Sequence, residues 1–458
     1  MVRSSFDYRY VLMTNPDHSP VEMRKSPMSV IAKYRRFRQA LHNADPTAFV
    51  GIIDLAYEHY ALGDTLTTEI DLAVQAIEAG RQYFDLIVMA DPSRPAASMQ
   101  RFITPSNYLY YLDNLLPAYL CMPMLRSLRI IGDRPTLHFN LMSYAIGRQP
   151  MWPTLGRYFR QRNYPLGHAR VNAFYEKHGH IPKFNAPRGY ELWVKQFMAQ
   201  QFADRIVVVI NPRQGVLSST PTVLYRDAPL PEWYRFLRWS ACEHPKVMYL
   251  AVGAFAEWEN ALHQFPNVFI PRTRGLHLGH ELALLAHADM FLGTSSGFAT
   301  FATFSDIPYV VLNIEEHFAG HAGIEAGDER YPFAREGQIL TWEQEDAEAL
   351  RHLFERILAT IDVAAILAKR QSWAGVPDRV PENRMGSNGS AVVRAVWHPS
   401  TEASSTEHRG DRFMKGRPAT GEADARPGKM GQMVTESPDA KETGEGSEMR
   451  MTAPPTPR

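Results

Sequence analysis

The chain of 458 residues has only two cysteines, Cys121 and Cys242, which excludes a disulfide scaffold and a cysteine-based zinc module. Lys plus Arg and Asp plus Glu both number 49, so no excess of positive charge indicates a nucleic-acid partner. No apolar run approaches the ~18 residues of a membrane-spanning helix. The first residues, MVRSSFDYRY, lack the apolar core of a signal peptide. A cytoplasmic protein without nucleic-acid partners is therefore expected.

Several cofactor and metal motifs are also missing. The sequence contains no G-x-G-x-x-G and no G-x-x-x-x-G-K-[ST], so neither a dinucleotide site nor a P-loop is predicted. It contains no Asp-x-Asp pair to hold a metal-bound diphosphate. The close histidine pairs His317/His321, His277/His280 and His178/His180 lack matching acidic or cysteine ligands. We therefore expect no cofactor and no metal.

Apolar residues make up 45% of the chain, enough for a sizeable core, but they are unevenly distributed. From Ser372 the sequence is rich in Pro, Gly, Ser, Thr, Glu and Arg, and its final 60 residues contain one aromatic, Phe413. Such a segment buries too little apolar surface to offset the entropy of ordering. Residues 372–458 are therefore predicted to be a disordered tail.

The second half of the folded part alternates apolar runs with helical patterns. The expected strands are Arg205–Ile210, Val247–Val252, Val268–Ile270, Met290–Leu292 and Tyr309–Leu312. The expected helices are Tyr190–Phe202, Glu232–Ala241, Gly279–Ala288, Gly297–Phe304 and Ala347–Ile361. This alternation is typical of parallel β-α units in a doubly wound sheet, and it predicts a Rossmann-like domain over residues 189–371.

The first half gives a weaker pattern of the same kind. The expected strands are Tyr10–Met13, Val50–Leu55, Asp85–Met89, Leu128–Ile131 and Leu137–Leu141. The run Thr65–Ala79 has the apolar spacing of an amphipathic helix, and Pro150–Arg188 is expected to be a long connection. The fold class predicted is α/β, with two Rossmann-like halves, 1–188 and 189–371, facing a cleft.

The strongest local feature is FLGTSSGFATFATF, Phe291–Phe304, in which a strand ends in a small-residue turn and a helix starts at once. Unpaired N–H groups at a helix start suit a phosphate, and the candidate contacts are Thr294, Ser295, Ser296 and Gly297. The alternative is that Ser295 or Ser296 simply caps the helix.

The same turn matches G-x-S-x-G, the nucleophile motif of α/β hydrolases, with Ser295 as the nucleophile of a serine esterase. Glu315 or Glu316, followed by His317 or His321, would preserve the hydrolase order of serine, acid and histidine. Against this hypothesis, the motif lies on a late strand and no HGGG-type oxyanion segment is present. The hydrolase is therefore the alternative function.

Two arginines follow the first strand of the second half. Arg213, in INPRQ, lies directly beyond the strand, where its planar guanidinium could bind phosphate oxygens. Arg226 is a second candidate cation, although it could instead pair with Asp227. A surface arginine that closes a turn is the alternative for Arg213.

The motif YALGDT, Tyr60–Thr65, precedes the first predicted helix and places Asp64 at the expected N-cap position. A carboxylate at the edge of the cleft could accept a proton from an attacking hydroxyl, with Glu58 and His59 close by. The basic segment Arg24–Arg38, interleaved with apolar residues, is compatible with contact at the inner face of an anionic membrane or with a solvated helix surface.

Together these residues resemble the GT-B glycosyltransferases. The resemblance rests on the stretch Lys183–Asn313, with the runs VVVINPRQG, YRDAPLPEWYRFL, FPNVFIP and ELALLAHADMFLGTSSGFATFATFSDIPYVVLN. This stretch is similar to bacterial surface-polysaccharide glycosyltransferases. It resembles fucosyltransferases around Arg213 and heptosyltransferases around the strand–Ser–Gly–helix turn, and YALGDT is similar to the Gly-Asp turn of heptosyltransferases.

The resemblance implies a metal-independent transferase that moves a sugar from a nucleotide-diphosphate donor to a glycan or glycolipid acceptor. Arg213, Arg226 and Thr294–Gly297 would then hold the donor diphosphate, and Asp64 would act as the base. Asn211 and Ser295 stand where fucosyltransferases have His and heptosyltransferases have Asp, so the donor sugar is not identified. A two-lobed protein that binds nucleotide sugars without catalysis is a third hypothesis.

Overall fold

The computed structural model describes residues 38, 47–57, 61–90, 108–132, 134–160, 168–214, 227–253, 260–314, 319, 322–343 and 345–375. Tyr10–Met13, all of the segment Arg24–Arg38 except Arg38, and the predicted tail from residue 376 onward lie outside this part of the chain. Among the described helices, none is long and apolar enough to cross a bilayer.

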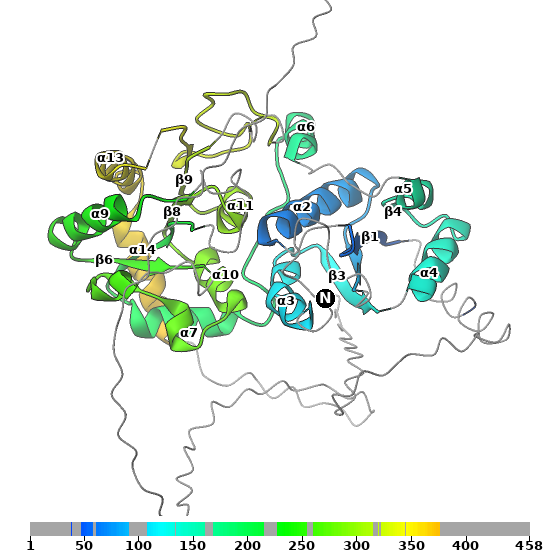
Figure 1. The fold of residues 1–458 in the computed structure, drawn as a ribbon, viewed down its shortest axis with the longest axis horizontal. Coiled ribbons are helices and arrows are strands. Elements are labelled where there is room, and N and C mark those ends of the chain that lie inside the picture. The colour runs from blue at the N-terminus through cyan, green and yellow to red at the C-terminus, as the bar shows by residue number, and fades with distance from the viewer. Residues whose placement is uncertain are drawn as a thin grey trace, which may run out of the picture. The chain divides into compact units, whose positions relative to one another are not determined.

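The N-terminal sheet has the order β3-β2-β1-β4, with all neighbours parallel. Its strands are β1 (Phe49–Asp54), β2 (Phe84–Met89), β3 (Leu125–Ile131) and β4 (Met151–Trp152). One face packs against α2 (Leu62–Glu78) and α3 (Tyr108–Leu115), and the other packs against α4 (Arg134–Ile146) and α5 (Leu155–Arg160) (Figure 1). The 3₁₀ helix η1 (Ala118–Leu120) and α6 (His168–His178) lie against α2. We call residues 47–178 the N-terminal lobe.

The prediction of a strand at Leu137–Leu141 is wrong, because these residues lie in α4. The five letters LHFNL alternate apolar and polar residues, which mimics a half-buried strand over a short window. Over a longer window, the buried residues Leu137, Leu141 and Tyr144 recur at helical spacing, and Pro135 lies in the first turn, where a missing N–H is tolerated.

The predicted connection Pro150–Arg188 is more structured than expected. It contains β4, α5 and α6, and β4 extends the sheet beside β1 through the pairs Val50–Met151 and Gly51–Trp152. A two-residue strand and a six-residue helix are too short to show a hydrophobic period, so no sequence pattern marks them.

The C-terminal sheet has the order β10-β9-β8-β5-β6-β7, again wholly parallel. Its strands are β5 (Ile206–Asn211), β6 (Val247–Ala251), β7 (Val268–Phe269), β8 (Met290–Thr294), β9 (Tyr309–Leu312) and β10 (Gln338–Leu340). Numbered within this sheet alone, the order is 6-5-4-1-2-3, which is the Rossmann arrangement read from the opposite edge. The predicted α/β architecture with two parallel sheets is therefore confirmed.

Helices cover both faces of this sheet. On one face lie α7 (Glu191–Gln201), α10 (Leu278–Ala286) and α11 (Gly297–Thr303), and on the other lie α9 (Leu230–Glu243) and α13 (Ala347–Leu358). Short 3₁₀ helices occur at η3 (Asn260–Gln264), η4 (Pro271–Arg274) and η5 (Trp373–Gly375). A helix that the sequence did not predict, α14 (Val363–Ser372), packs on α7 and β5, and with η5 the described structure continues past the predicted start of the tail at Ser372. We call residues 191–375 the C-terminal lobe.

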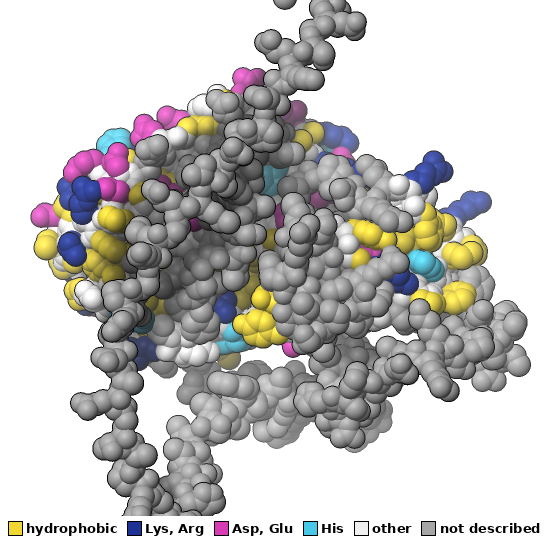
Figure 2. Space-filling model, in the orientation of Figure 1, with side chains coloured by type: hydrophobic (Ala, Val, Ile, Leu, Met, Phe, Trp, Pro, Cys, Tyr) yellow, Lys and Arg dark blue, Asp and Glu magenta, His cyan; other side chains and the backbone are white. Residues whose placement is uncertain are grey.

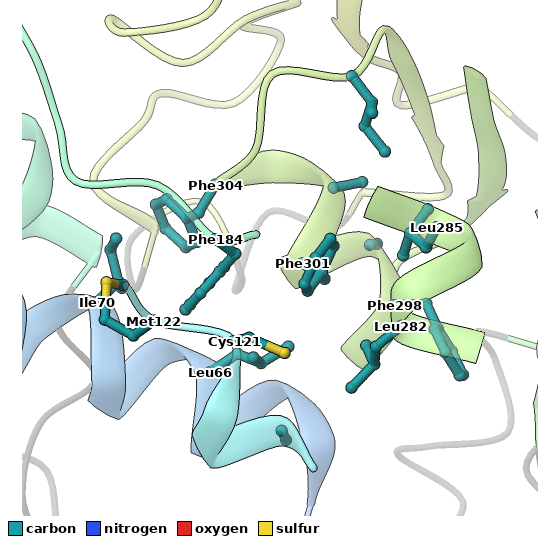
Figure 3. Packing of buried hydrophobic residues seen from close by; sticks show 14 of the residues in the cluster. Leu66, Ile70, Cys121, Met122, Phe184, Leu282, Leu285, Phe298, Phe301 and Phe304 are labelled. Atoms are coloured by element: carbon teal, nitrogen blue, oxygen red, sulfur yellow. The ribbon is translucent and has the colours of Figure 1, made fainter. Parts of the chain in front are cut away.

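A continuous apolar cluster joins the two lobes. Leu66 and Ile70 of α2 belong to the same buried cluster as Phe298 and Phe301 of α11, with Phe184 stacked on Phe301 at 5.6 Å between ring centroids (Figure 3). The helix starts also approach closely, since a Cβ on Gly297 would lie 2.6 Å from Leu62 Cβ and 2.8 Å from Gly63 N. The absence of a side chain at Gly297 is therefore required by packing between the lobes.

Candidate active site

A cleft of about 640 Å³ lies between the lobes. From the N-terminal lobe it is lined by the start of α2, by Tyr110, Tyr111 and Asn114 of α3, and by His168. From the C-terminal lobe it is lined by Asn211, Arg213, Gly253, Arg272, Leu278, Ser295–Thr300, Thr303, Val311, Ile314, Tyr331 and Leu340. The structure therefore brings Asp64, Arg213, Ser295, Ser296 and Gly297 together at one cleft.

The sheet topology explains why these residues meet. In an open parallel sheet, ligands bind beyond the carboxyl ends of the strands, where the strand order reverses direction. In the C-terminal sheet this point lies between β5 and β8, and the chain continues from them to Arg213 and to Ser295. In the N-terminal sheet it lies between β1 and β4, and the chain continues from β1 towards Asp64. The cleft thus joins both reversal points.

The turn after β8 is held mainly by its own hydrogen bonds. Ser296 is the N-cap of α11, where its Oγ accepts a hydrogen bond from Ala299 N at 3.3 Å. The capping role is therefore confirmed for Ser296, and contact with a phosphate stays a prediction. Thr294 is fully buried beneath the cleft, where its Oγ1 accepts from Arg213 N at 3.4 Å. Thr294 thus positions Arg213 and does not line the cleft.

Beneath this turn lies a buried acid that the sequence did not single out. Glu345 is 2% exposed, and its Oε2 accepts a hydrogen bond from Trp233 Nε1 at 2.7 Å. Burial raises the pKa of Glu345 to about 7, although hydrogen bonds from Trp233 and Thr294 act in the opposite direction. The support of Arg213 therefore includes a carboxyl that changes charge near neutral pH.

Arg213 is fixed at the cleft wall by backbone and side chain. Its carbonyl accepts from Ala228 N at 2.8 Å, and its Nη1 lies 3.0 Å from Asp227 Oδ1. The side chain is 14% exposed, so it faces the cleft with little freedom. Pairing with Asp227 was the alternative role considered for Arg226, which lies outside the described residues; in the structure Asp227 pairs with Arg213.

A second cation of the cleft, Arg272, was missed in the sequence. It belongs to η4, and its Nη2 and Nε lie 2.7 and 2.9 Å from Oε2 of Glu281, which is wholly buried in α10. One carboxylate oxygen thus orients the guanidinium at the cleft wall. No sequence signal marked this arginine, because its partner and its position depend on how η4 packs against α10.

Asp64 lines the cleft from the first turn of α2, but it is not the N-cap. That prediction is wrong: α2 begins at Leu62, and its N-cap is Ala61, whose side chain makes no capping hydrogen bond. Contact of Leu62 and Gly63 with α11 supports the earlier start. Asp64 is consequently the third residue of the helix, where a carboxylate interacts favourably with the helix dipole. Glu58 and His59 lie outside the described residues.

His168 is a further polar residue that sequence reasoning missed. It begins α6, is buried at the cleft wall, and its Nε2 lies 3.0 Å from Thr67 Oγ1. Thr67 follows Asp64 by three residues, so the two side chains share one side of α2. The three-residue spacing of Asp64 and Thr67 was visible in the sequence. The contact of Thr67 with His168, about a hundred residues later in the chain, was not.

The hydrolase hypothesis finds little support in the backbone. A nucleophile elbow places its serine on a strained turn. Among the described non-glycine residues, only Arg148 and Asn313 have positive φ, so Ser295 lacks that strain. Its amide instead donates to Leu312 O at 3.0 Å, as in a continuing strand pair. Glu315, Glu316, His317 and His321 lie outside the described residues.

The described residues include no group of three or more side chains arranged to hold a metal ion. His277 and His280 instead form the capping box of α10, in which His277 Nδ1 accepts from Gly279 N at 3.1 Å. Burial lowers the pKa of both rings, that of His280 to about 4. His178 stacks on Phe174, and its carbonyl lies 3.0 Å from His180 Nδ1.

No family model and no curated protein matches the sequence. Among solved structures, the fold is similar to a family 9 glycosyl transferase from Veillonella parvula, with 12% identity, a TM-score of 0.40, and coverage of 72% of this chain and 98% of that one. It is also similar to E. coli ADP-heptose lipopolysaccharide heptosyltransferase II, with 12% identity, a TM-score of 0.38, and coverage of 71% of this chain and 99% of that one. A putative UDP-N-acetylglucosamine 2-epimerase from Listeria monocytogenes is similar with 8% identity, a TM-score of 0.33, and coverage of 71% of this chain and 91% of that one. Heptosyltransferases, which the sequence resembles, are thus among the similar structures, but TM-scores below 0.5 assign no family or activity to this chain.

Proposed function

We propose that this protein is a GT-B glycosyltransferase, which moves a sugar from a nucleotide-diphosphate donor to an acceptor hydroxyl. The observation that carries the proposal is one cleft at the reversal points of two parallel sheets, with Asp64 from one lobe and Arg213 and Arg272 from the other. Sugar transfer needs a proton acceptor beside the attacking hydroxyl and positive charge beside the departing diphosphate. The cleft contains a candidate proton acceptor on one side and two candidate cations on the other.

In this proposal the C-terminal lobe binds the donor. The bond from the sugar to the diphosphate breaks, and negative charge builds up on the departing oxygens. Arg213 and Arg272 stabilise that charge, because each guanidinium is already oriented by a carboxylate of the protein. Ser295, Ser296 and Gly297 contact the phosphates from the turn, with Thr294 supporting them from below. Arg226 stays a predicted donor contact.

The N-terminal lobe binds the acceptor. Asp64 accepts the proton of the attacking hydroxyl as that oxygen bonds to the sugar carbon. Tyr110, Tyr111 and Asn114 of α3 line the same side of the cleft and offer ring faces and an amide to a glycan or glycolipid acceptor. We propose residues 1–188 as the acceptor domain and residues 189–371 as the donor domain, acting in surface-polysaccharide or glycoconjugate synthesis.

A thermal-shift panel of nucleotide sugars tests the donor half of the proposal. A true donor at ~100 times its dissociation constant should stabilise the protein by ~2.7 kcal/mol. Arg213→Ala should remove most of this shift, whereas Arg235→Ala should retain it, because Arg235 lies on the exposed side of α9. Absence of a shift with every nucleotide sugar, or an equal shift in both variants, would contradict the proposal.

Turnover separates a transferase from the other hypotheses. Once a donor is found, release of nucleoside diphosphate in the presence of glycan acceptors should be measured with and without EDTA. We expect turnover that survives EDTA, since two arginines occupy the role of a metal. Binding without release under any condition would indicate a non-catalytic binding protein. Labelling of Ser295 by a fluorophosphonate would indicate the hydrolase.

A further inference from the structure

The N-terminal lobe carries an unusual surface away from the residues that line the cleft. In α4 the side chains of Met142 and Ile146 are 49% and 59% exposed, and Phe159 of the neighbouring α5 is 54% exposed. His138 and Phe159 lie 5.2 Å apart between ring centroids. Because His138, Met142 and Ile146 follow one another at four-residue spacing, they form a single stripe that Phe159 extends.

This stripe lacks the charge expected of an exposed helix face. A surface helix normally places charged residues opposite its apolar side. In α4 the only residue that is charged at neutral pH is Arg134, which is paired with Asp54 at 2.7 Å, and burial lowers the pKa of His138. Scattered exposed apolar residues need no explanation, but a continuous stripe of them marks an interaction surface.

The sequence around the stripe is strongly basic. Residues 114–175 contain eight arginines, no lysine and a single acid, Asp133, although the whole chain is neutral. Arg126, Arg134 and Arg170 form ion pairs with acids of the sheet or of α2. Arg148, just beyond α4, and Arg160, at the end of α5, are exposed to solvent. Figure 2 shows the hydrophobic side chains over α4 and α5 with basic side chains beside them.

Arg148 lies directly beyond the C-terminus of α4. Its φ is 51°, in the left-handed region, and this conformation caps the helix, since Gln149 N donates to Tyr144 O at 2.9 Å and Arg148 N donates to Ala145 O at 3.2 Å. The cap holds the Arg148 backbone at the end of the helix, and the side chain is exposed to solvent. An exposed guanidinium directly beyond the apolar stripe is well placed to bind an anion at the same surface as Ile146.

We propose that α4 and α5 dock this lobe on an anionic lipid bilayer. Met142, Ile146 and Phe159 enter the interface between headgroups and acyl chains, and Arg148 and Arg160 bind lipid phosphates. Interfacial binding combines buried apolar area with attraction of basic residues to anionic lipids, and this surface presents both. The inference does not depend on the proposed sugar transfer, because none of these residues lines the cleft.

Vesicle sedimentation of the full chain tests this surface. The protein should bind vesicles that contain phosphatidylglycerol and not vesicles of phosphatidylcholine alone, and added salt should weaken the binding. The double variant Arg148→Asn/Arg160→Gln should bind about 25-fold more weakly, at roughly fivefold for each arginine. Asparagine tolerates the left-handed backbone, so this variant should fold. Lys246→Gln/Arg330→Gln, which neutralises two exposed cations of the C-terminal lobe, is the matched control and should bind normally.

A fluorophore tests the apolar part. Ile146→Cys, labelled in a Cys242→Ser background because Cys242 is also exposed, should shift its emission to the blue on phosphatidylglycerol vesicles. No binding by the wild type, equal binding by the arginine variant and its control, or no spectral shift would overturn the proposal. A dimer in solution that Met142→Ser/Ile146→Ser converts to monomer, without vesicle binding, would show instead that a second copy covers the stripe.

Discussion

The two lobes are built from the same parallel β-α units, but different interactions hold them together. Interior strands of the C-terminal sheet, such as β5 (IVVVIN) and β9 (YVVL), are almost wholly apolar. The N-terminal strands carry charges: Asp54 ends β1 and pairs with Arg134, and Asp85 in β2 pairs with Arg126. The strands of the N-terminal sheet thus carry the acids of ion pairs themselves, whereas in the C-terminal lobe the buried acid Asp289 lies just before β8, where it pairs with Arg370 of α14 at 2.6 Å and accepts a hydrogen bond from Val207 N of β5 at 2.8 Å.

The lobes also differ in the chemistry that they bring to the cleft. The N-terminal lobe contributes a carboxylate, Asp64, and the C-terminal lobe contributes Arg213 and Arg272. If the proposed function is right, changes in the first lobe should affect turnover, and changes in the second should affect donor affinity.

The largest effect is expected for Asp64→Asn. Removal of a general base typically costs 10²–10⁴-fold in rate, so turnover should fall by ~10²–10⁴ while the donor affinity stays near that of the wild type. Steady-state kinetics together with donor titration would measure this separation. Asp113→Asn, an acid of α3 that does not line the cleft, is the control and should keep normal turnover. A large loss of donor affinity in Asp64→Asn would break the assignment of roles to lobes.

The next largest effect is expected on stability, when the ion pair Asp54–Arg134 is broken. Asp54 is 1% exposed, and it also accepts a hydrogen bond from Tyr158 Oη at 2.7 Å. Asp54→Ala leaves a partly buried guanidinium without its carboxylate, so it should lower the free energy of unfolding by ~3–5 kcal/mol in urea titration. Glu348→Ala, which removes an exposed pair with Arg351, should cost less than ~1 kcal/mol. Equal costs would show that the buried pair Asp54–Arg134 contributes no more to stability than an exposed pair does.

Glu345 predicts a pH dependence that belongs to the C-terminal lobe. Its pKa is about 7 in the folded protein, against an ordinary value of 4.5, so the folded state keeps a proton that the unfolded chain releases. Its contribution to stability is complete below pH 4.5, is lost as the pH rises to about 7, and changes little above that. Glu345→Gln should therefore gain stability relative to the wild type over this window, by an amount on the order of 3 kcal/mol. Melting curves of both proteins at several pH values measure this change. A difference in stability between Glu345→Gln and the wild type that stays constant with pH would contradict the prediction.

The smallest effect is expected where the lobes touch. A Cβ at Gly297 would lie 2.8 Å from Gly63 N, so Gly297→Ala should push α2 from α11 and cost ~1–3 kcal/mol of stability. A Cβ at Gly63 would meet its nearest atom, Thr300 Oγ1, at 3.4 Å, so Gly63→Ala is the matched control and should be tolerated. Thermal unfolding of both variants measures the difference. If both variants unfold at the wild-type temperature, the contact between α2 and α11 can widen at little cost in stability.

The accuracy of the sequence predictions follows the same contrast between the lobes. The expected strand runs of the C-terminal half match β5–β9, because buried parallel strands appear as continuous apolar runs. The strand predicted at Leu137–Leu141 was wrong because local alternation competed with a helical period that becomes visible only over a longer window. β10 and α14 were missed, since three residues and a weakly amphipathic helix give little signal.

The candidate site shows a similar division. Asp64, Arg213 and the turn Ser295–Gly297 could be predicted because each follows a strand at the carboxyl edge of a parallel sheet. Arg272 and His168 could not, because their positions depend on the packing of η4 on α10 and of α6 on α2. The sequence predicted that Gly297 lets a phosphate approach the backbone. The structure shows in addition that Gly297 packs against Leu62 and Gly63 of the other lobe.

By itself, the sequence determined that the chain is α/β, where most strands of its second half lie, and which strand ends carry polar groups. These properties are local, since burial and hydrogen bonding of a strand act over a few neighbouring residues. The tertiary structure decided that Asp64 meets Arg213 and Arg272, that Thr294 supports the cleft without lining it, and that α4 leaves its apolar stripe exposed. These depend on contacts between residues distant in the sequence, which no local pattern records.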